Sequence, residues 1–153
     1  MKVEFWMTGK TDHKYLNEGI QLYNKRIQHY IPFNILEVNT IKSKTQILYQ
    51  KDESQQLLKI LNKDDYLILL DDKGKEYSSQ DFSEQLQKLF HLSAPRLIFI
   101  AGGAYGFHDA LYNRANDKLS LSKMTFPHDL CRLIFLEQLY RALTIAHNHP
   151  YQH

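Results

Sequence analysis

Residues 96–107 read Arg-Leu-Ile-Phe-Ile-Ala-Gly-Gly-Ala-Tyr-Gly-Phe, and this stretch decides the fold. The run Arg96–Ala101 is short and almost continuously apolar, which is the pattern of a strand buried on both faces of a sheet. Gly102 and Gly103 follow it at once. Because glycine has no Cβ, it lets the backbone approach a ligand closely and permits positive φ. We therefore expect a buried strand followed by a ligand-binding loop, although the loop alone is as compatible with a plain strand-to-helix turn.

Outward from this stretch, strands alternate with helices. A second apolar run, Tyr66–Leu70, predicts another buried strand, and the Asp-Asp-Lys-Gly that follows predicts a turn. Three further strands are predicted at Lys2–Thr8, at residues 33–38 and near Lys118–Ser122. Apolar residues at helical spacing predict helices from an Asp12 cap to before Pro32, over about Ser43–Leu61, from a Ser79 cap to Phe90, around His108–Ala115 and from Pro127 to about His147. This alternation is typical of an α/β domain with a mostly parallel sheet flanked by helices, and we expect one domain over residues 1–153.

Composition narrows the class of protein. The chain has 153 residues, which suits one domain. Cys131 is its single cysteine, so an internal disulfide is excluded and a reducing compartment is favoured. The longest uncharged apolar-leaning run, residues 97–107, falls well short of the roughly 20 residues that a membrane span needs. We expect a cytoplasmic protein without a membrane segment, and the net charge of +2 permits an RNA partner without arguing for one.

Three predicted strand ends carry residues suited to ligand binding. Parallel α/β sheets bind ligands outside the carboxyl ends of their strands. The segments there are residues 70–72, 102–107 and 121–126. A dinucleotide-binding loop is excluded, because Ala101 occupies the first glycine position of Gly-x-Gly-x-x-Gly and no ribose-binding acid follows about 20 residues later.

Four motifs in the last third of the chain point to one family. They are residues 100–107, residues 119–128 (Leu-Ser-Leu-Ser-Lys-Met-Thr-Phe-Pro-His), residues 137–142 (Glu-Gln-Leu-Tyr-Arg-Ala) and residues 148–151 (Asn-His-Pro-Tyr). Together with the Lys-Val start and the Leu-Leu-Asp at residues 69–71, they resemble the ribosomal large-subunit pseudouridine N3-methyltransferases, a single-domain branch of the knotted SPOUT methyltransferases. The resemblance implies a C-terminal trefoil knot, S-adenosylmethionine as cofactor, and methylation of N3 of a pseudouridine in 23S rRNA on assembled ribosomes.

The resemblance also implies which residues hold the cofactor. They are Leu70, Gly102, Gly103, Leu121, Ser122, Lys123, Met124, Thr125 and Phe126. The apolar members can form a slot for adenine and the hydroxyls can donate hydrogen bonds, whereas without the resemblance Leu121 and Phe126 would read as core residues. We expect Gly103 to lie so close to the ligand that Gly103→Val abolishes cofactor binding in a folded protein.

Catalytic candidates lie near the C-terminus. The acceptor nitrogen must lose a proton, so a base or a cation that stabilises the anion would help. Candidates are His149, Tyr151, His153 and Arg141. The family has His and then a basic residue after Pro-Tyr, whereas this chain has Gln152 and His153, so the identity of a base stays open. Arg141 could instead pair with a carboxylate, and the tail histidines lack the acidic or cysteine partners of a metal site.

The last predicted helix argues for a homodimer. Its apolar residues are distributed around nearly the whole circumference, and a partner could cover the side that a small domain leaves exposed. The tail that follows could then reach the partner's cofactor loop. A function of another class stays open at this point, namely a noncatalytic α/β protein that binds a nucleotide or an RNA through the same loops.

Overall fold

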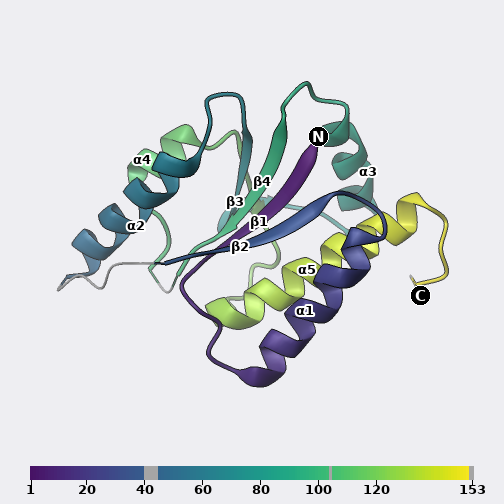
Figure 1. Cartoon of the computed structure of the whole chain (residues 1–153), viewed down its shortest axis with the longest axis horizontal. Helices are drawn as coiled ribbons and strands as arrows, with labels where there is room; N and C mark the ends of the chain where they lie inside the picture. Colours follow the sequence, from purple (N-terminus) through teal and green to yellow (C-terminus); the bar gives the residue numbers. More distant parts are fainter. Residues whose placement is uncertain (40–44, 104, 152–153) are drawn as a thin grey trace.

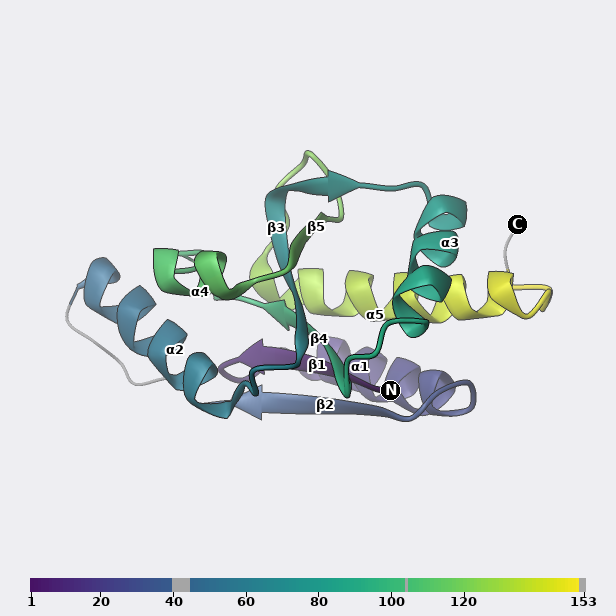
Figure 2. The same ribbon diagram turned by 90° about the horizontal axis from the view of Figure 1, so that it is seen from above.

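The structure, a computed structural model, describes residues 1–39, 45–103 and 105–151. Its centre is one parallel sheet of five strands in the order β2-β1-β4-β3-β5. Figure 1 labels the first four of these strands and Figure 2 labels β5 beside β3. The strands are β1 (Lys2–Thr8), β2 (Phe33–Val38), β3 (Tyr66–Glu76), β4 (Arg96–Ala101) and β5 (Asp117–Ser120). The helices are α1 (Lys14–Gln28), α2 (Gln46–Ile60), α3 (Ser79–Phe90), α4 (Asp109–Arg114) and α5 (His128–Ala146). The predicted α/β class with a parallel sheet and flanking helices is confirmed.

Strand β4 lies at the centre because both of its faces are apolar. Leu97 and Phe99 join the core under α1, α3 and α5, while Ile98 and Ile100 join the core under α2 and α4. Both views show the helices divided in this way between the two faces (Figures 1 and 2). The alternation follows from the period of two of a strand. Residues 97–100 of β4 therefore contribute side chains to both cores.

The prediction that the strand ends at Leu70 and a turn follows at residues 71–74 is wrong. Strand β3 continues to Glu76, and its register with β5 shifts between Leu70 and Lys75. A Cβ on Gly74 would lie 2.7 Å from the backbone nitrogen of Leu119, so the backbones of β3 and β5 approach each other more closely than any side chain allows. The glycine that read as a turn residue permits this irregular pairing instead.

Two predicted caps are also wrong. Asp12 does not cap α1, since its backbone N–H donates to Asp129 Oδ2 at 3.1 Å and His13 holds the cap position. Ser78 caps α3 by accepting from the N–H of Asp81 at 3.0 Å, one residue before the predicted Ser79. The predicted start of the second helix at Ser43 lies outside the described residues, within which α2 begins after Thr45.

Helix α5 is covered within the chain more fully than its sequence suggested. Its apolar residues pack on the sheet and also against α1 and α3, the two helices beside it. Gly19 of α1 makes room for Leu133, because a Cβ there would lie 2.9 Å from that side chain. Leu130, Ile134 and Ile145 stay partly exposed on the outer side. In the described part of the chain, no helix is long and apolar enough to cross a membrane.

Candidate active site

A cleft of about 210 Å³ lies at the carboxyl edge of the sheet. The segments after β3, β4 and β5 meet there, as the sequence predicted for a parallel sheet. Its lining consists of Leu70, Asp71, Asp72, Ala101, Gly102, Gly103, Gly106, Phe107, Leu119, Leu121, Ser122, Met124, Thr125, Phe126, His128 and Cys131. Of the cofactor residues that the family resemblance implied, all but Lys123 line this cleft; Lys123 lies exposed in the same loop.

Gly102 and Gly103 play different steric parts in the loop after β4. A Cβ on Gly102 would lie 2.9 Å from the ring of Phe107, so this ring packs directly on the glycine. A Cβ on Gly103 would make only ordinary contacts, the nearest at 3.5 Å from Glu53 Oε2. Neither needs a left-handed backbone, whereas Gly106 has φ of 72°. The expected positive φ therefore falls on Gly106. The tight packing at Gly102 is against Phe107, and close approach of the loop to a ligand stays a prediction.

The loop between β5 and α5 is held by its own hydroxyls. Ser120 Oγ donates to the carbonyl of Ser122 at 3.0 Å, and Ser122 Oγ accepts from the N–H of Met124 at 3.0 Å. Met124 is 76% exposed and so stands at the mouth of the cleft rather than in its floor. The apolar slot predicted for a ring thus narrows to Leu70, Leu121 and Phe126, which are buried or half-buried.

An acidic wall completes the cleft, and the site residues chosen from sequence omitted it. Asp71 Oδ2 accepts from the hydroxyl of Tyr112, and its Oδ1 accepts from the N–H of Lys73 at 2.8 Å. Burial, and then the hydrogen bond to Asp71, raise the pKa of Tyr112 far above its ordinary value, so its hydroxyl stays a donor. The signal in the sequence was the Leu-Asp-Asp at a predicted strand end. Its partner Tyr112 lies 41 residues away and could not be found by spacing.

A buried polar cluster braces the cleft from behind. The guanidinium of Arg132, fully buried in α5, donates to the carbonyl of Thr8 at 2.6 Å and to Thr11 Oγ1 at 2.9 Å. Asp129 lies 3.6 Å from the same guanidinium. Burial lowers the pKa of Arg132, and the charge of Asp129 partly opposes this. The cluster ties the end of β1 to the start of α5, next to the loop that lines the cleft.

Glu53 of α2 lies behind the glycine loop. It is 2% exposed, and burial raises the pKa of its carboxyl, although polar neighbours, Gly103 first among them, partly offset the effect. Sequence reasoning missed both Glu53 and Arg132. A buried charge has no local signature, because helix periodicity describes apolar residues and leaves isolated charged residues as solvent-facing by default.

The tail residues form their own cluster at the other end of α5. The Tyr151 hydroxyl donates to Glu137 Oε1 at 3.1 Å and lies 3.2 Å from the Tyr23 hydroxyl. Arg141 pairs with the same carboxylate at 2.5 Å and lies over the Tyr151 ring at 4.7 Å from its centroid. The expected pairing of Arg141 with a carboxylate is thus confirmed. Burial, and then the bond to Tyr23, raise the pKa of Tyr151 far above its ordinary value, so its hydroxyl stays protonated.

Within one chain, the tail does not reach the cleft. Helix α5 separates them, because His128 and Cys131 at its start line the cleft and the tail follows its last residue, Ala146. Figure 1 shows the C-terminus at the far end of α5. Its 19 residues span about 28 Å at 1.5 Å per residue. His149 Nδ1 bonds the Tyr30 hydroxyl instead of any cleft residue. His153 lies outside the described residues, and within them no three His, Cys, Asp or Glu side chains are grouped to hold a metal.

The fold and the cleft define a class first. A parallel sheet with a glycine loop and an apolar, hydroxyl-bearing cleft at its carboxyl edge is an α/β protein built to bind a small molecule with a ring and polar groups. The family model described as "Predicted SPOUT methyltransferase" matches residues 1–153, and the chain belongs to the SPOUT methyltransferase family. This finding confirms the predicted enzyme class and leaves the noncatalytic alternative without support.

Relatives of the chain carry one name. The "Ribosomal RNA large subunit methyltransferase H" of Parabacteroides distasonis is 47% identical over 156 residues, covering 100% of this chain and 99% of the relative. Proteins of the same name from Cytophaga hutchinsonii and Christiangramia forsetii are 47% and 44% identical, each covering 100% of this chain and 100% and 99% of the relative. The resemblance drawn from the four motifs is confirmed at the level of this family.

Proposed function

We propose that this protein uses S-adenosylmethionine to methylate large-subunit rRNA, at N3 of a pseudouridine in 23S rRNA within the assembled ribosome. The observation that carries the proposal is the cleft, because the three segments that the motifs single out come together in it. The names of the relatives support rRNA as the substrate. A single domain over residues 1–153, with the knotted C-terminal topology of its family, carries the activity in the cytoplasm, where ribosomes are found.

The lining fits the cofactor by its chemistry. S-adenosylmethionine supplies an activated methyl group when bound, so the protein's contribution is alignment in a dry site. Leu70, Leu121 and Phe126 offer apolar surface to adenine, and Ser122 and Thr125 offer hydroxyls. Gly102 and Gly103 have no Cβ, so the backbone of their loop could approach the cofactor closely. Cys131 also lines the cleft, but burial raises the pKa of its thiol, so it stays protonated and is no competing nucleophile.

A second copy of the chain completes the site in this proposal. The tail lies one helix length from its own cleft, so a homodimer in which the two α5 helices pair antiparallel about a twofold axis would bring each tail to the partner's cleft. The outer side of α5 suits this pairing, because Leu130, Ile134 and Ile145 lie there partly exposed. Since α1 and α3 cover the rest of the helix, the contact is confined to this side.

The tail residues take separate roles. Arg141, a permanent cation, would stabilise the anion left when the acceptor nitrogen loses its proton. Tyr151 keeps its proton and therefore donates a hydrogen bond rather than acting as a base. His149 is the remaining described candidate for a base, with its Nδ1 bonded to Tyr30.

Nucleoside mass spectrometry of ribosomal RNA tests the substrate. Ribosomes from cells lacking the gene, incubated with purified protein and S-adenosylmethionine, should gain one N3-methylated pseudouridine in 23S rRNA. Free 23S rRNA should stay unmodified under the same conditions. Methylation of another nucleotide, or of no nucleotide, would refute the assignment.

Deleting residues 149–153 tests the tail. We expect cofactor binding and dimerisation to stay nearly intact, and methyl transfer to ribosomes to fall by two or more orders of magnitude (about 3 kcal/mol or more of barrier) because the acceptor loses its partners. Tyr151→Phe and His149→Ala separate the hydroxyl from the imidazole. Full activity of the truncated protein would remove the tail from the site, and a monomer of about 18.1 kDa in light scattering would exclude the composite site.

A further inference from the structure

The charge of the cleft has one sign. Asp71 and Asp72 are acids in its lining, and among the described lining residues there is no lysine or arginine. His128 is the one basic side chain among the described lining residues, and its Nε2 lies 3.2 Å from Asp129 Oδ1. The carboxylates in the lining can therefore attract a cation bound beside them.

Of the two acids, Asp71 is the one held in place. Both of its oxygens are occupied from the protein side, by the Tyr112 hydroxyl and by the N–H of Lys73 at 2.8 Å. Its side chain is half-buried, whereas Asp72 is exposed and its charge is screened by water. A fixed, partly desolvated carboxylate acts on a neighbouring charge more strongly than a mobile one.

The group that holds Asp71 belongs to the cleft as well. The Tyr112 ring packs edge to face on Phe107, with centroids 5.8 Å apart and planes at 88°. Phe107 in turn packs under Gly102. Lys118 Nζ lies 5.8 Å from the centroid of the Tyr112 ring. The aspartate, the tyrosine and the glycine loop thus form one packed unit at the junction of β3 and β4.

We propose that Asp71 gives the cleft its preference for the sulfonium of S-adenosylmethionine over the neutral thioether of S-adenosylhomocysteine. The inference rests on the proposed function. The two ligands share adenosine, ammonium and carboxylate, so these groups cancel in the comparison and only the charge at sulfur differs. Because Asp71 lines this cleft of about 210 Å³, a charge bound beside it lies within the Debye length of about 8 Å at physiological salt and interacts with it.

This preference also bears on turnover. On transfer, a bond forms between the methyl carbon and the acceptor nitrogen, the carbon–sulfur bond breaks with its electron pair left on sulfur, and the nitrogen's proton leaves to a base. The ligand in the cleft thereby loses one positive charge. The attraction to Asp71 is lost at that moment, which favours release of the product.

Calorimetric titration with three ligands tests the proposal. They are S-adenosylmethionine, S-adenosylhomocysteine and sinefungin, which carries a protonated amine in place of the methylated sulfur. Asp71→Asn keeps the size of the side chain and its capacity to accept from Tyr112. We expect it to weaken binding of the two cationic ligands about 10-fold and of the thioether less than about threefold.

Matched variants separate local charge from other effects. Asp64→Asn removes an exposed acid before β3 and should change no affinity, which excludes net charge as the cause. Asp72→Asn should have a smaller effect than Asp71→Asn. Tyr112→Phe removes the hydroxyl that fixes Asp71 and should lower the sulfonium preference with the acid still present. This variant keeps the test open if Asp71→Asn does not fold, as judged by circular dichroism.

The outcomes distinguish the two levels of the proposal. Equal loss of affinity for all three ligands on Asp71→Asn, or an unchanged ratio between them, overturns the role of Asp71 while the cofactor site stands. A wild-type protein that binds none of the three overturns the proposed function itself.

Discussion

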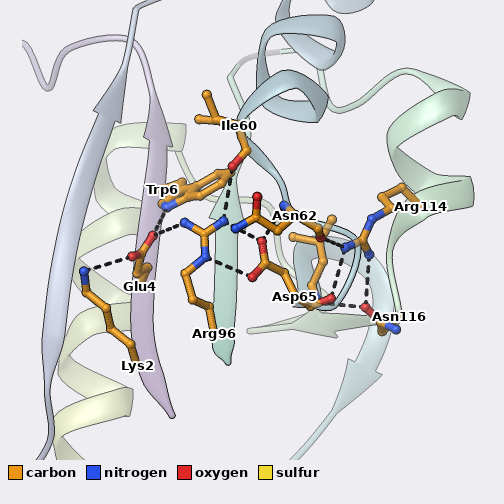
Figure 3. A network of polar contacts seen from close by, with 10 residues as sticks. Lys2, Glu4, Trp6, Ile60, Asn62, Asp65, Arg96, Arg114 and Asn116 are labelled. Atoms are coloured by element: carbon orange, nitrogen blue, oxygen red, sulfur yellow. Dashed lines mark hydrogen bonds and ion pairs between the residues drawn. The ribbon is translucent and has the colours of Figure 1, made fainter. Parts of the chain in front are cut away.

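The two edges of the same sheet treat polar groups in opposite ways. At the amino edge, Arg96 donates to Asp65 at 2.9 and 2.5 Å, lies 3.4 Å from Glu4, and donates to the carbonyl of Ile60 at 3.2 Å (Figure 3). The Trp6 indole N–H donates to Glu4 at 2.7 Å. Each buried charge in this network has a partner of opposite sign or a hydrogen bond.

At the carboxyl edge, some buried polar atoms make no hydrogen bond. Among the described residues, five such side-chain atoms occur: Asn24 Oδ1 in α1, and Thr8 Oγ1, Glu53 Oε2, Asp129 Oδ1 and Arg132 Nε behind the cleft. Asp129 Oδ1 nevertheless lies 3.2 Å from His128 Nε2. Buried unsatisfied groups are rare and costly, and the last four of these residues lie behind the cleft rather than in its lining. The amino edge therefore satisfies its buried charges, whereas the carboxyl edge, where the cleft lies, leaves some buried polar atoms without a hydrogen bond.

The largest effect should come from Gly103→Val at the carboxyl edge. The valine Cβ would lie 3.5–3.7 Å from its neighbours, which is ordinary contact. The two methyl groups beyond it must either project into the cleft or collide with the side-chain oxygens of Glu53 and Thr8. We expect S-adenosylmethionine affinity to fall at least about 100-fold in a protein with a native circular dichroism spectrum. Gly103→Ala is the control and should bind nearly as wild type. Native affinity in the valine variant would remove Gly103 from the site.

A smaller effect of the opposite kind is expected from Arg96→Ala at the amino edge. It leaves the Asp65 carboxylate, whose side chain is 0% exposed, without its counter-charge. We expect the free energy of unfolding in urea to fall by about 2–4 kcal/mol, toward the low side of values for broken buried pairs because Arg96 is 21% exposed. Cofactor affinity should be unchanged. If affinity fell with stability, the two edges would not be independent.

The smallest effect should be a difference in pH dependence. Burial alone raises the pKa of Asp65, but hydrogen bonds from Arg96 and from the backbone of Asn62 outweigh it, so the pKa is lowered in the folded protein. Its stabilisation is therefore present above the unfolded pKa of about 3.9 and is lost as the pH falls through the folded pKa.

Glu53 should show the opposite dependence. Because burial raises its pKa, its contribution is present below the unfolded value of about 4.3 and is lost as the pH rises through the folded pKa. We would measure the free energy of unfolding from about pH 3 to 7. In Asp65→Asn, the fall in this free energy at low pH should become smaller. In Glu53→Gln, the fall that wild type shows as the pH rises through the pKa of Glu53 should disappear. The same slope in both variants would contradict the contrast between the edges.

The sequence predicted the bounds of β1 and β4, which agree with Lys2–Thr8 and Arg96–Ala101. A continuous apolar run did not by itself fix a strand end, since β3 continues past Leu70 to Glu76. The boundary at residues 71–74 failed because Gly74 permits backbone contact with β5, a long-range cause that no local pattern carries. The caps of α1 and α3 failed by one residue for a related reason, as neighbouring polar residues compete for the same position.

The site divides in the same way. Contiguous motifs predicted the loops that line the cleft, because each loop directly follows a strand. Residues that act across the fold were missed: Tyr112 on Asp71, Glu53 behind Gly103, and Arg132 under the end of β1. Each of these pairs joins elements that become neighbours only after the sheet has formed.

The central place of β4 also orders events in time. The strand pairs with β1 on one side and β3 on the other, and every pairing in the sheet is parallel and so joins segments distant in sequence. During synthesis β4 can join β1 to β3 only after residue 101 has emerged, β5 completes the sheet at residue 120, and the cleft lacks a wall until Cys131 has followed. Sheets of this kind fold slowly, because distant segments must meet before they gain contacts. A chain that ends before Cys131 therefore lacks a complete cleft.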